Sequence, residues 1–245
     1  MTFLEVKSLS KSFGGLQVLS KIDFNLHQSE ILGLIGPNGS GKTTLFNLIT
    51  GFLKPNGGKI VFKGKDITSA SSHRVCQAGI ARTFQLVKPF AHMTALQNVM
   101  VGRMYGRKPA QSLKEARKEA EEILESTGLG AKKFKVAQSL TLSDRKRLEL
   151  AKALATKPEL LLIDEMMAGL TLTETEEAIT IIKKIRDSGI TTMVVEHVMR
   201  AVLGISDRIM VLNAGEKIAE GLPYEIMEDK QVIEAYLGKE SYARD

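Results

Sequence analysis

The sequence predicts an α/β fold in which crossover helices connect the strands of a parallel sheet. Short apolar runs such as Ile31–Ile35 and Leu160–Ile163 have the pattern of strands buried on both faces. An amphipathic stretch at Glu174–Asp187 separates two of the later runs, as a crossover between parallel strands requires. The 245 residues are enough for one large α/β domain, or for a core with a small subdomain.

The first third of the chain holds the earlier strands. Strands are predicted over four runs that turns rich in glycine separate: Leu4–Val6, Ile22–Leu26, Ile31–Ile35 and Lys59–Phe62. A helix is predicted at Thr44–Thr50. The strand pattern stops near Gln85.

The rest of the chain divides into a helical and a mixed part. Residues 89–155 form a predicted helical insertion, with helices over Leu113–Thr127 and Ser143–Ala155. Strand patterns return at three places, and a helix closes the chain: Leu160–Ile163, Thr192–Val195 and Ile209–Leu212, then Pro223–Leu237.

The net charge of +6 is concentrated in one segment, because residues 100–157 hold 14 Lys and Arg against 7 Asp and Glu. Three interpretations are open for this segment: a solvated helical face, proximity to an anionic membrane surface, or contact with nucleic acid. Glutamates alternate with the basic residues at helical spacing, which favours the solvated face. Few aromatic side chains are present for base stacking, so no nucleic-acid partner is expected.

The cysteine count and the apolar runs bear on where the protein is expected to function. The single cysteine, Cys76, excludes an internal disulfide and agrees with a reducing compartment. No apolar run approaches the roughly 20 residues that span a bilayer. The N-terminal segment lacks an apolar signal core, so export is not expected.

The most informative motif lies at residues 36–43, which read G-P-N-G-S-G-K-T. The motif leaves a predicted strand and opens a predicted helix, so backbone N–H groups and the positive helix end meet at an anion site. Lys42 has the length to reach the β- and γ-phosphates, and the Thr43 hydroxyl is predicted to ligate Mg²⁺. The predicted nucleotide-binding residues are Gly36, Asn38, Gly39, Ser40, Gly41, Lys42, Thr43 and Thr44.

Two carboxylates follow the buried run at Leu160–Ile163. Ligands of open α/β sheets bind beyond the carboxyl ends of the strands, which is where Asp164 and Glu165 are expected. Asp164 is predicted to hold Mg²⁺ directly or through water. Glu165 is predicted to orient or deprotonate an attacking water.

With these motifs in order, the chain resembles the ATP-binding-cassette (ABC) ATPases over nearly its whole length. The resemblance implies a P-loop NTPase fold: a RecA-like parallel core sheet with an antiparallel β subdomain over 1–88 and 156–245, and a helical subdomain over 89–155. It also implies ATP hydrolysis, with ATP and Mg²⁺ as cofactors.

The same resemblance assigns three further residues. Gln85, in ARTFQ, is similar to the loop glutamine that contacts Mg²⁺ or the attacking water. His197, in VVEH, is similar to the switch histidine that contacts the γ-phosphate, and Phe13 stands where the family stacks an aromatic ring on adenine. The implied catalytic set is Lys42, Gln85, Glu165 and His197.

The family's signature, usually L-S-G-G-Q, contacts the nucleotide of a partner subunit. It is matched here by Leu140, Thr141, Leu142, Ser143 and Asp144. Ser143 adds a Cβ where the family has glycine, and Asp144 brings negative charge toward a γ-phosphate. Met166 and Thr171 depart from the family pattern as well, since they stand where a proline and an Asp or Asn are usual. Because this chain lends an altered signature to its partner's nucleotide, a heterodimer is predicted to hydrolyse ATP faster at the site built on this chain's own phosphate loop.

Three strings narrow the resemblance to ATPases of branched-chain amino acid importers: ITGFLKPNGGKIVFKGKDIT, GIARTFQ and VIEAYLG. The implied partners are a second ABC ATPase subunit, identical or different, transmembrane permease subunits and, indirectly, a solute-binding protein. The implied location is cytoplasmic, at the inner face of the cell membrane, with residues 86–99 in the permease contact.

Two alternatives stay open at this point, namely a soluble ABC ATPase outside transport and a nucleotide-binding subunit with little hydrolysis of its own. A small GTPase would need N-K-x-D after the phosphate loop, and the nearest string, at residues 20–23, precedes it.

Overall fold

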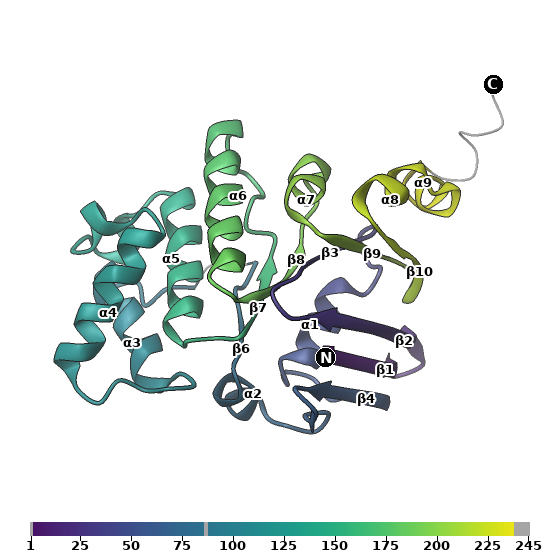
Figure 1. Cartoon of the computed structure of the whole chain (residues 1–245), viewed down its shortest axis with the longest axis horizontal. Helices are drawn as coiled ribbons and strands as arrows, with labels where there is room; N and C mark the ends of the chain where they lie inside the picture. Colours follow the sequence, from purple (N-terminus) through teal and green to yellow (C-terminus); the bar gives the residue numbers. More distant parts are fainter. Residues whose placement is uncertain (1, 86–87, 238–245) are drawn as a thin grey trace. The chain divides into compact units, whose positions relative to one another are not determined.

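The computed structural model describes residues 2–85 and 88–237 (Figure 1). Its contacts divide the chain into two compact units. Unit 1 is Met1–Ser72 with Thr191–Asp245, and unit 2 is His73–Ile190. None of the helices in the described residues is long and apolar enough to cross a membrane.

Unit 1 contains an antiparallel sheet in the order β2-β1-β4-β5. Its strands are β1 (Thr2–Phe13), β2 (Leu16–His27), β4 (Gly57–Phe62) and β5 (Lys65–Asp66). β1 and β2 are longer than the apolar runs that predicted them, because their solvent-facing positions are polar and weaken the sequence signal.

Unit 1 also contains three parallel strands in the order β9-β3-β8, with β10 antiparallel beside β9. They are β3 (Ile31–Ile35), β8 (Thr191–Val195), β9 (Arg208–Asn213) and β10 (Glu216–Gly221). Every residue of β3 and β8 is buried, as the apolar runs predicted. Two helices accompany these strands, α1 (Lys42–Ile49) and α7 (Met199–Ile205). A Cβ on Gly33 would come within 2.6 Å of Ser206 Oγ, so this glycine permits close packing below α7.

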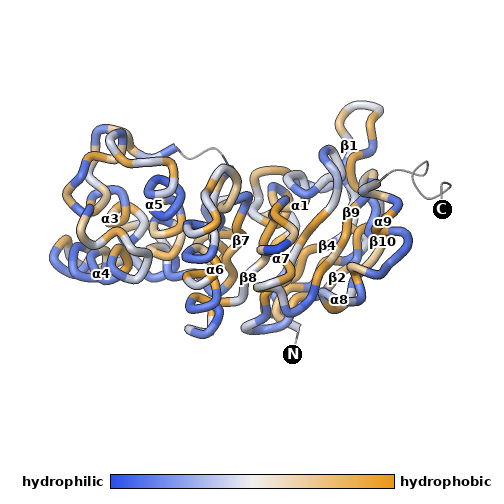
Figure 2. Tube along the Cα trace, turned by 90° about the horizontal axis from the view of Figure 1, so that it is seen from above, coloured by the Kyte–Doolittle hydropathy of each residue, from blue (hydrophilic) through white to orange (hydrophobic). Residues whose placement is uncertain are grey.

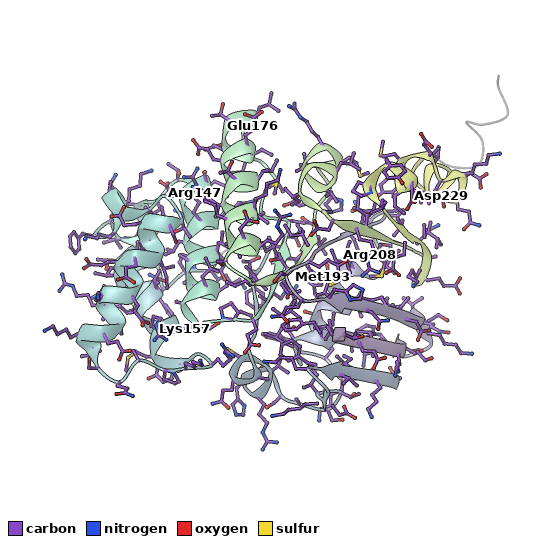
Figure 3. The ribbon with its side chains drawn as sticks, viewed as in Figure 1. Arg147, Lys157, Glu176, Met193, Arg208 and Asp229 are labelled. Atoms are coloured by element: carbon purple, nitrogen blue, oxygen red, sulfur yellow. The ribbon has the colours of Figure 1, made fainter. Side chains whose placement is uncertain are left out.

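The single helix predicted at Pro223–Leu237 is wrong, because the structure has two: α8 (Pro223–Glu228) and α9 (Lys230–Leu237). Asp229, labelled in Figure 3, is extended (φ −70°, ψ 119°). Its carboxylate accepts bonds from the backbone N–H groups of Gln231 and Val232, at 2.8 and 3.2 Å. A side chain that caps the second helix therefore interrupts an otherwise periodic pattern.

Unit 2 pairs two parallel strands, β6 (Ile80–Arg82) and β7 (Leu160–Asp164), with a set of helices. The elements between and after the strands are α3 (Ala95–Tyr105), α4 (Leu113–Ser126), the 3-10 turns η1 (Gly130–Lys132) and η2 (Ala137–Ser139), α5 (Leu142–Ala155) and α6 (Leu172–Asp187). Helices α3, α4 and α5 enclose a small apolar core that includes Val99, Leu124 and Leu148. Figure 2 shows the contrast between the mostly hydrophilic α4 and the apolar strands of unit 1.

Several helices and strands were not predicted from the sequence: α2 (Ser72–Ala78), β6, α3, α7 and β10. Helix α3 mixes Gln, Asn and Gly with apolar residues, so no clear apolar stripe forms. A local signal was nevertheless present, because Thr94 and Gln97 form a capping box at its start.

Candidate functional site

The phosphate loop lies between β3 and α1 in unit 1, as predicted. All three of its glycines, Gly36, Gly39 and Gly41, have positive φ, and at two of them an added Cβ would also clash. Gly36 has φ +152°, and a Cβ there would lie 2.0 Å from Leu212 O. Gly41 has φ +103°, and a Cβ there would lie 2.5 Å from Leu19 Cδ2. The loop conformation therefore depends on the absence of side chains at both positions.

Lys42 is buried and turned onto its own loop. Its Nζ donates to Gly36 O at 2.8 Å, to Pro37 O at 2.9 Å and to the buried hydroxyl of Ser40 at 3.4 Å. Three acceptors from the loop thus hold the ammonium group within it. This places a fixed positive charge beside the backbone that leads into α1.

The donor set of the loop suits a polyphosphate anion. Lys42, Thr43 and Thr44 form the first turn of α1, whose leading N–H groups have no partner within the helix. Asn38, Gly39 and Thr43 are exposed, whereas Ser40 and Gly41 are buried. Backbone donors, an ammonium and hydroxyl groups therefore meet at one end of a helix.

Two other predicted residues belong to unit 1. Phe13 ends β1, is 46% exposed and has Lys11 Nζ 5.1 Å from its ring centroid, so a planar face is available for stacking. His197 is exposed and follows β8 by two residues, after the buried Glu196. Because β8 pairs in parallel with β3, His197 and the phosphate loop follow neighbouring strand ends.

In unit 2, Asp164 ends β7 and is 3% exposed. Its Oδ2 accepts a bond from Arg82 Nη2 at 2.5 Å, and its N–H donates to Thr83 Oγ1 at 3.0 Å. Both partners come from β6 and the residue after it, so the paired strands fix the carboxylate. The guanidinium of Arg82 therefore lies directly against the buried carboxylate as its charge partner.

Gln85 and Glu165 are joined directly. Gln85 Nε2 donates to Glu165 Oε2 at 2.5 Å, so the structure brings these two predicted residues together beside Asp164. Glu165 has φ +47°, which is uncommon for a residue with a side chain. The buried Lys146 of α5 donates to Glu165 O at 3.0 Å and to Ala168 O at 2.5 Å, and so holds this turn.

The segment Leu140–Asp144 leads into α5. Thr141 is the N-cap, and its Oγ1 accepts a bond from Asp144 N at 3.2 Å. Leu142 is 53% exposed, while Ser143 and Asp144 are buried. Lys132 Nζ donates to both carboxylate oxygens of Asp144, at 2.7 Å each. Burial opposes ionisation of Asp144, but the bonds from Lys132 and Thr141 outweigh it and lower the pKa.

The two other departures from the family pattern have structural explanations. Met166 is 4% exposed, so this apolar side chain is buried directly after Glu165. Thr171 caps α6 by accepting from Glu174 N at 3.3 Å, while Glu174 Oε2 accepts from Thr171 N at 2.9 Å. The bonds that the Glu174 carboxylate accepts from the backbone N–H and the hydroxyl of Thr171 lower its pKa. A capping box needs Thr, Ser, Asp or Asn at the cap, so threonine keeps the helix start.

Three residues that contact the predicted site residues were not predicted from the sequence: Arg82, Lys132 and Lys146. The string ARTFQ contained Arg82, but its partner Asp164 lies 82 residues away. Lys146 is on α5 three residues after Ser143, which predicts a shared helical face but not the loop that Lys146 contacts. Pairing across loops leaves no periodic signal in the sequence.

Comparisons with known proteins agree with this geometry. The profile of the ABC transporter family matches residues 19–168, and that of the branched-chain amino acid ATP-binding cassette transporter matches residues 216–242. The high-affinity branched-chain amino acid transport ATP-binding protein LivG of Escherichia coli K12 is 39% identical, over 96% of this chain and 98% of its own.

Solved structures give the same result. The ADP conformation of MJ1267, an ATP-binding cassette of an ABC transporter, is 32% identical with a TM-score of 0.89, over 98% of this chain and 100% of its own. A dimeric bacterial ABC transporter cassette, MJ0796, is 26% identical with a TM-score of 0.82, over 90% of this chain and 98% of its own.

A phosphate loop between a buried strand and a helix, in a P-loop NTPase fold, defines a nucleotide-binding ATPase of the cassette type. The chain belongs to the ABC transporter family of ATP-binding proteins. The predicted fold class is confirmed.

Proposed function

We propose that the chain is the ATP-hydrolysing subunit of a membrane importer for branched-chain amino acids or related small amides. The similarity to LivG supports the solute class, since that protein's name states the transport. The match of residues 216–242 to a branched-chain amino acid transporter profile supports it independently. The subunit is peripheral, at the inner face of the cell membrane, and binds transmembrane permease subunits that receive solute from a solute-binding protein.

Two ATPase subunits, identical or different, bind two ATP molecules head to tail. In this arrangement Leu140–Asp144 of one subunit completes the phosphate loop of the other. The dimeric cassette among the similar structures supports the assembly. The nucleotide-binding core is residues 1–88 and 156–245, and the helical subdomain is 89–155. Residues 88–99 contribute to the permease contact; 86–87, also predicted there, lie outside the described residues.

The nucleotide is held by residues of unit 1. Phe13 stacks on adenine, and the loop from Gly36 to Thr44 surrounds the phosphates with N–H donors. Lys42 exchanges its loop carbonyls for β- and γ-phosphate oxygens, because a phosphate carries full negative charge and a carbonyl does not. Binding therefore needs a side-chain movement but no new backbone fold.

Thr43, Asp164 and Gln85 would hold Mg²⁺, which neutralises phosphate charge when bound. All three offer oxygen ligands, the type that Mg²⁺ prefers. No group of three or more His, Cys, Asp or Glu gathers into a metal site in the part of the chain that the structure describes. The remaining ligands would accordingly come from the nucleotide and water. Asp164 would share its charge between the ion and Arg82.

Glu165 accepts the proton of the attacking water, Gln85 orients the carboxylate, and His197 contacts the γ-phosphate. The observation that carries this assignment is the 2.5 Å bond between Gln85 Nε2 and Glu165 Oε2, next to the buried Asp164. An amide that donates to one oxygen of a carboxylate at the end of a buried strand fixes the orientation of that group, as a general base requires.

The test uses the complex that co-purifies with a tag on this chain. Glu165→Gln is expected to slow phosphate release by about 100-fold or more while ATP still binds, since an amide cannot accept the proton. Glu122→Gln, on the exposed face of α4, is the control and should match the wild type. Unchanged phosphate release in Glu165→Gln would remove Glu165 from this role. Uptake of labelled leucine, valine and short amides by vesicles carrying the complex tests the solute class.

A further inference from the structure

The start of α5 carries an ion pair that separates this chain from the family pattern. Asp144 stands where the family usually has glutamine, and both of its carboxylate oxygens accept from Lys132 Nζ at 2.7 Å. The Asp144 side chain is 8% exposed and the Lys132 side chain 39%. The carboxylate is thus enclosed, whereas the ammonium group reaches it from η1 at the surface.

Neighbouring cations are directed elsewhere. Arg145 Nη2 donates to Gln138 O at 2.6 Å, and Arg147 pairs with Glu177. Lys133, next to Lys132 in sequence, donates to Glu121 at 3.0 Å. Lys132 is therefore the ion-pair partner of Asp144.

This pair solves an electrostatic problem. The N-terminus of α5 is a favourable place for an anion, because its leading N–H groups point outward and carry partial positive charge. An ionised Asp144 in the first turn opposes a second anion there. The lowered pKa of Asp144 means that its charge persists at neutral pH, so only a counter-charge can cancel it.

We propose that Lys132 is a positioning residue for ATP hydrolysis, because it neutralises Asp144 and so allows Leu140–Asp144 to accept the γ-phosphate of the partner subunit's ATP. This rests on the proposed function, in which that segment faces the partner's nucleotide. Lys132 and Asp144 together replace the neutral amide of the usual signature. The substituted signature is then a neutral one built from two charged residues.

The experiment is a double-mutant cycle on the complex purified through a tag on this chain. Lys132→Met is expected to lower kcat for ATP hydrolysis about tenfold and to leave KM for ATP within about twofold, since ATP first binds the opposite phosphate loop. In the Asp144→Gln background, Lys132→Met should change kcat less than twofold. Lys132→Arg, which keeps the charge, should restore most of the turnover.

Lys133→Met is the matched control, because it removes a neighbouring ammonium that pairs with Glu121 instead. It should leave kcat and KM at wild-type values. Thermal unfolding of each variant checks folding, and Lys132→Gln replaces Lys132→Met if the latter unfolds early.

An equal loss of kcat from Lys132→Met in both backgrounds would overturn the inference, as would no loss in either. A rise in KM without a fall in kcat would also overturn it. A wild-type complex without ATP turnover would contradict the proposed function itself, and the inference would fail with it. Normal wild-type turnover with an unaffected Lys132→Met variant would refute the inference alone.

Discussion

The two units build their parts of the site from different groups. Unit 1 relies on backbone: glycines at positive φ, helix N–H groups and a lysine held by loop carbonyls. Unit 2 relies on paired side chains, with Arg82 on Asp164, Gln85 on Glu165 and Lys132 on Asp144. The difference teaches which substitutions each part tolerates. The phosphate loop should be sensitive to added atoms. The three carboxylates of unit 2 should be sensitive to the loss of a charge or of a hydrogen bond.

The largest effect is expected from adding one methyl group to the loop. Gly36→Ala would place a Cβ 2.0 Å from Leu212 O at a φ unsuited to alanine. We expect a loss of about 3 kcal/mol in unfolding free energy and a fall in ATP affinity of about 100-fold. Chemical unfolding and fluorescent-nucleotide titration measure these two quantities.

Gly64→Ala is the control for that substitution. Gly64 has φ +75° but no atom within 4 Å of an added Cβ, so it tests backbone strain without a clash. It should cost about 1 kcal/mol in unfolding free energy and leave ATP affinity unchanged. Equal effects at both glycines would show that close approach is not what the loop needs.

A smaller effect is expected from removing a charge that holds backbone in unit 2. Lys146→Met leaves Glu165 O and Ala168 O without their donor, which should reduce the unfolding free energy by about 1–3 kcal/mol. It should also slow ATP turnover about tenfold, because the turn that carries Glu165 is no longer held. Turnover and thermal unfolding are compared with Lys135→Met, at an exposed position. Wild-type turnover in Lys146→Met would separate the turn from catalysis.

The smallest effect concerns pH and should appear in the charge pairs rather than in the loop. Hydrogen bonds from Lys157 and Arg103 lower the pKa of Glu119 below its ordinary value of 4.5, although burial opposes them. A lowered folded-state pKa stabilises the fold above the unfolded-state value and loses that contribution as the pH falls below it. Glu119→Gln should therefore reduce the unfolding free energy by about 1 kcal/mol at pH 7 and by less near pH 3, because the contribution is lost as the pH falls through the folded-state pKa.

Denaturant unfolding at both pH values checks this expectation. Glu121→Gln, at a more exposed carboxylate that pairs with Lys133 and Arg117, should give a smaller difference between the two pH values. A deficit in Glu119→Gln that is as large at pH 3 as at pH 7 would mean that packing, not charge, accounts for it.

The comparison also explains what the sequence could predict. The limits of β3 matched the apolar run at Ile31–Ile35, because a strand buried on both faces has a continuous signal. The phosphate loop was predictable for a similar reason, since its motif is contiguous. The pairing of Lys132 with Asp144 was not predictable, because the segment between η1 and α5 is irregular and has no repeating sequence pattern. The separation of α8 from α9 was not predictable either, because it depends on one residue, Asp229, in a stretch that otherwise has a helical pattern.

The position of Lys42 has a consequence for how fast the site can fill. Its ammonium group donates to two carbonyls of the loop itself, Gly36 O and Pro37 O, and so links the lysine to the start of the loop. An arriving phosphate competes for those contacts and does not organise a disordered segment. The rate of ATP binding should then approach the diffusion-limited encounter rate, with little change in heat capacity. The rate of ADP release should depend on how readily Lys42 returns from the phosphate to the two loop carbonyls.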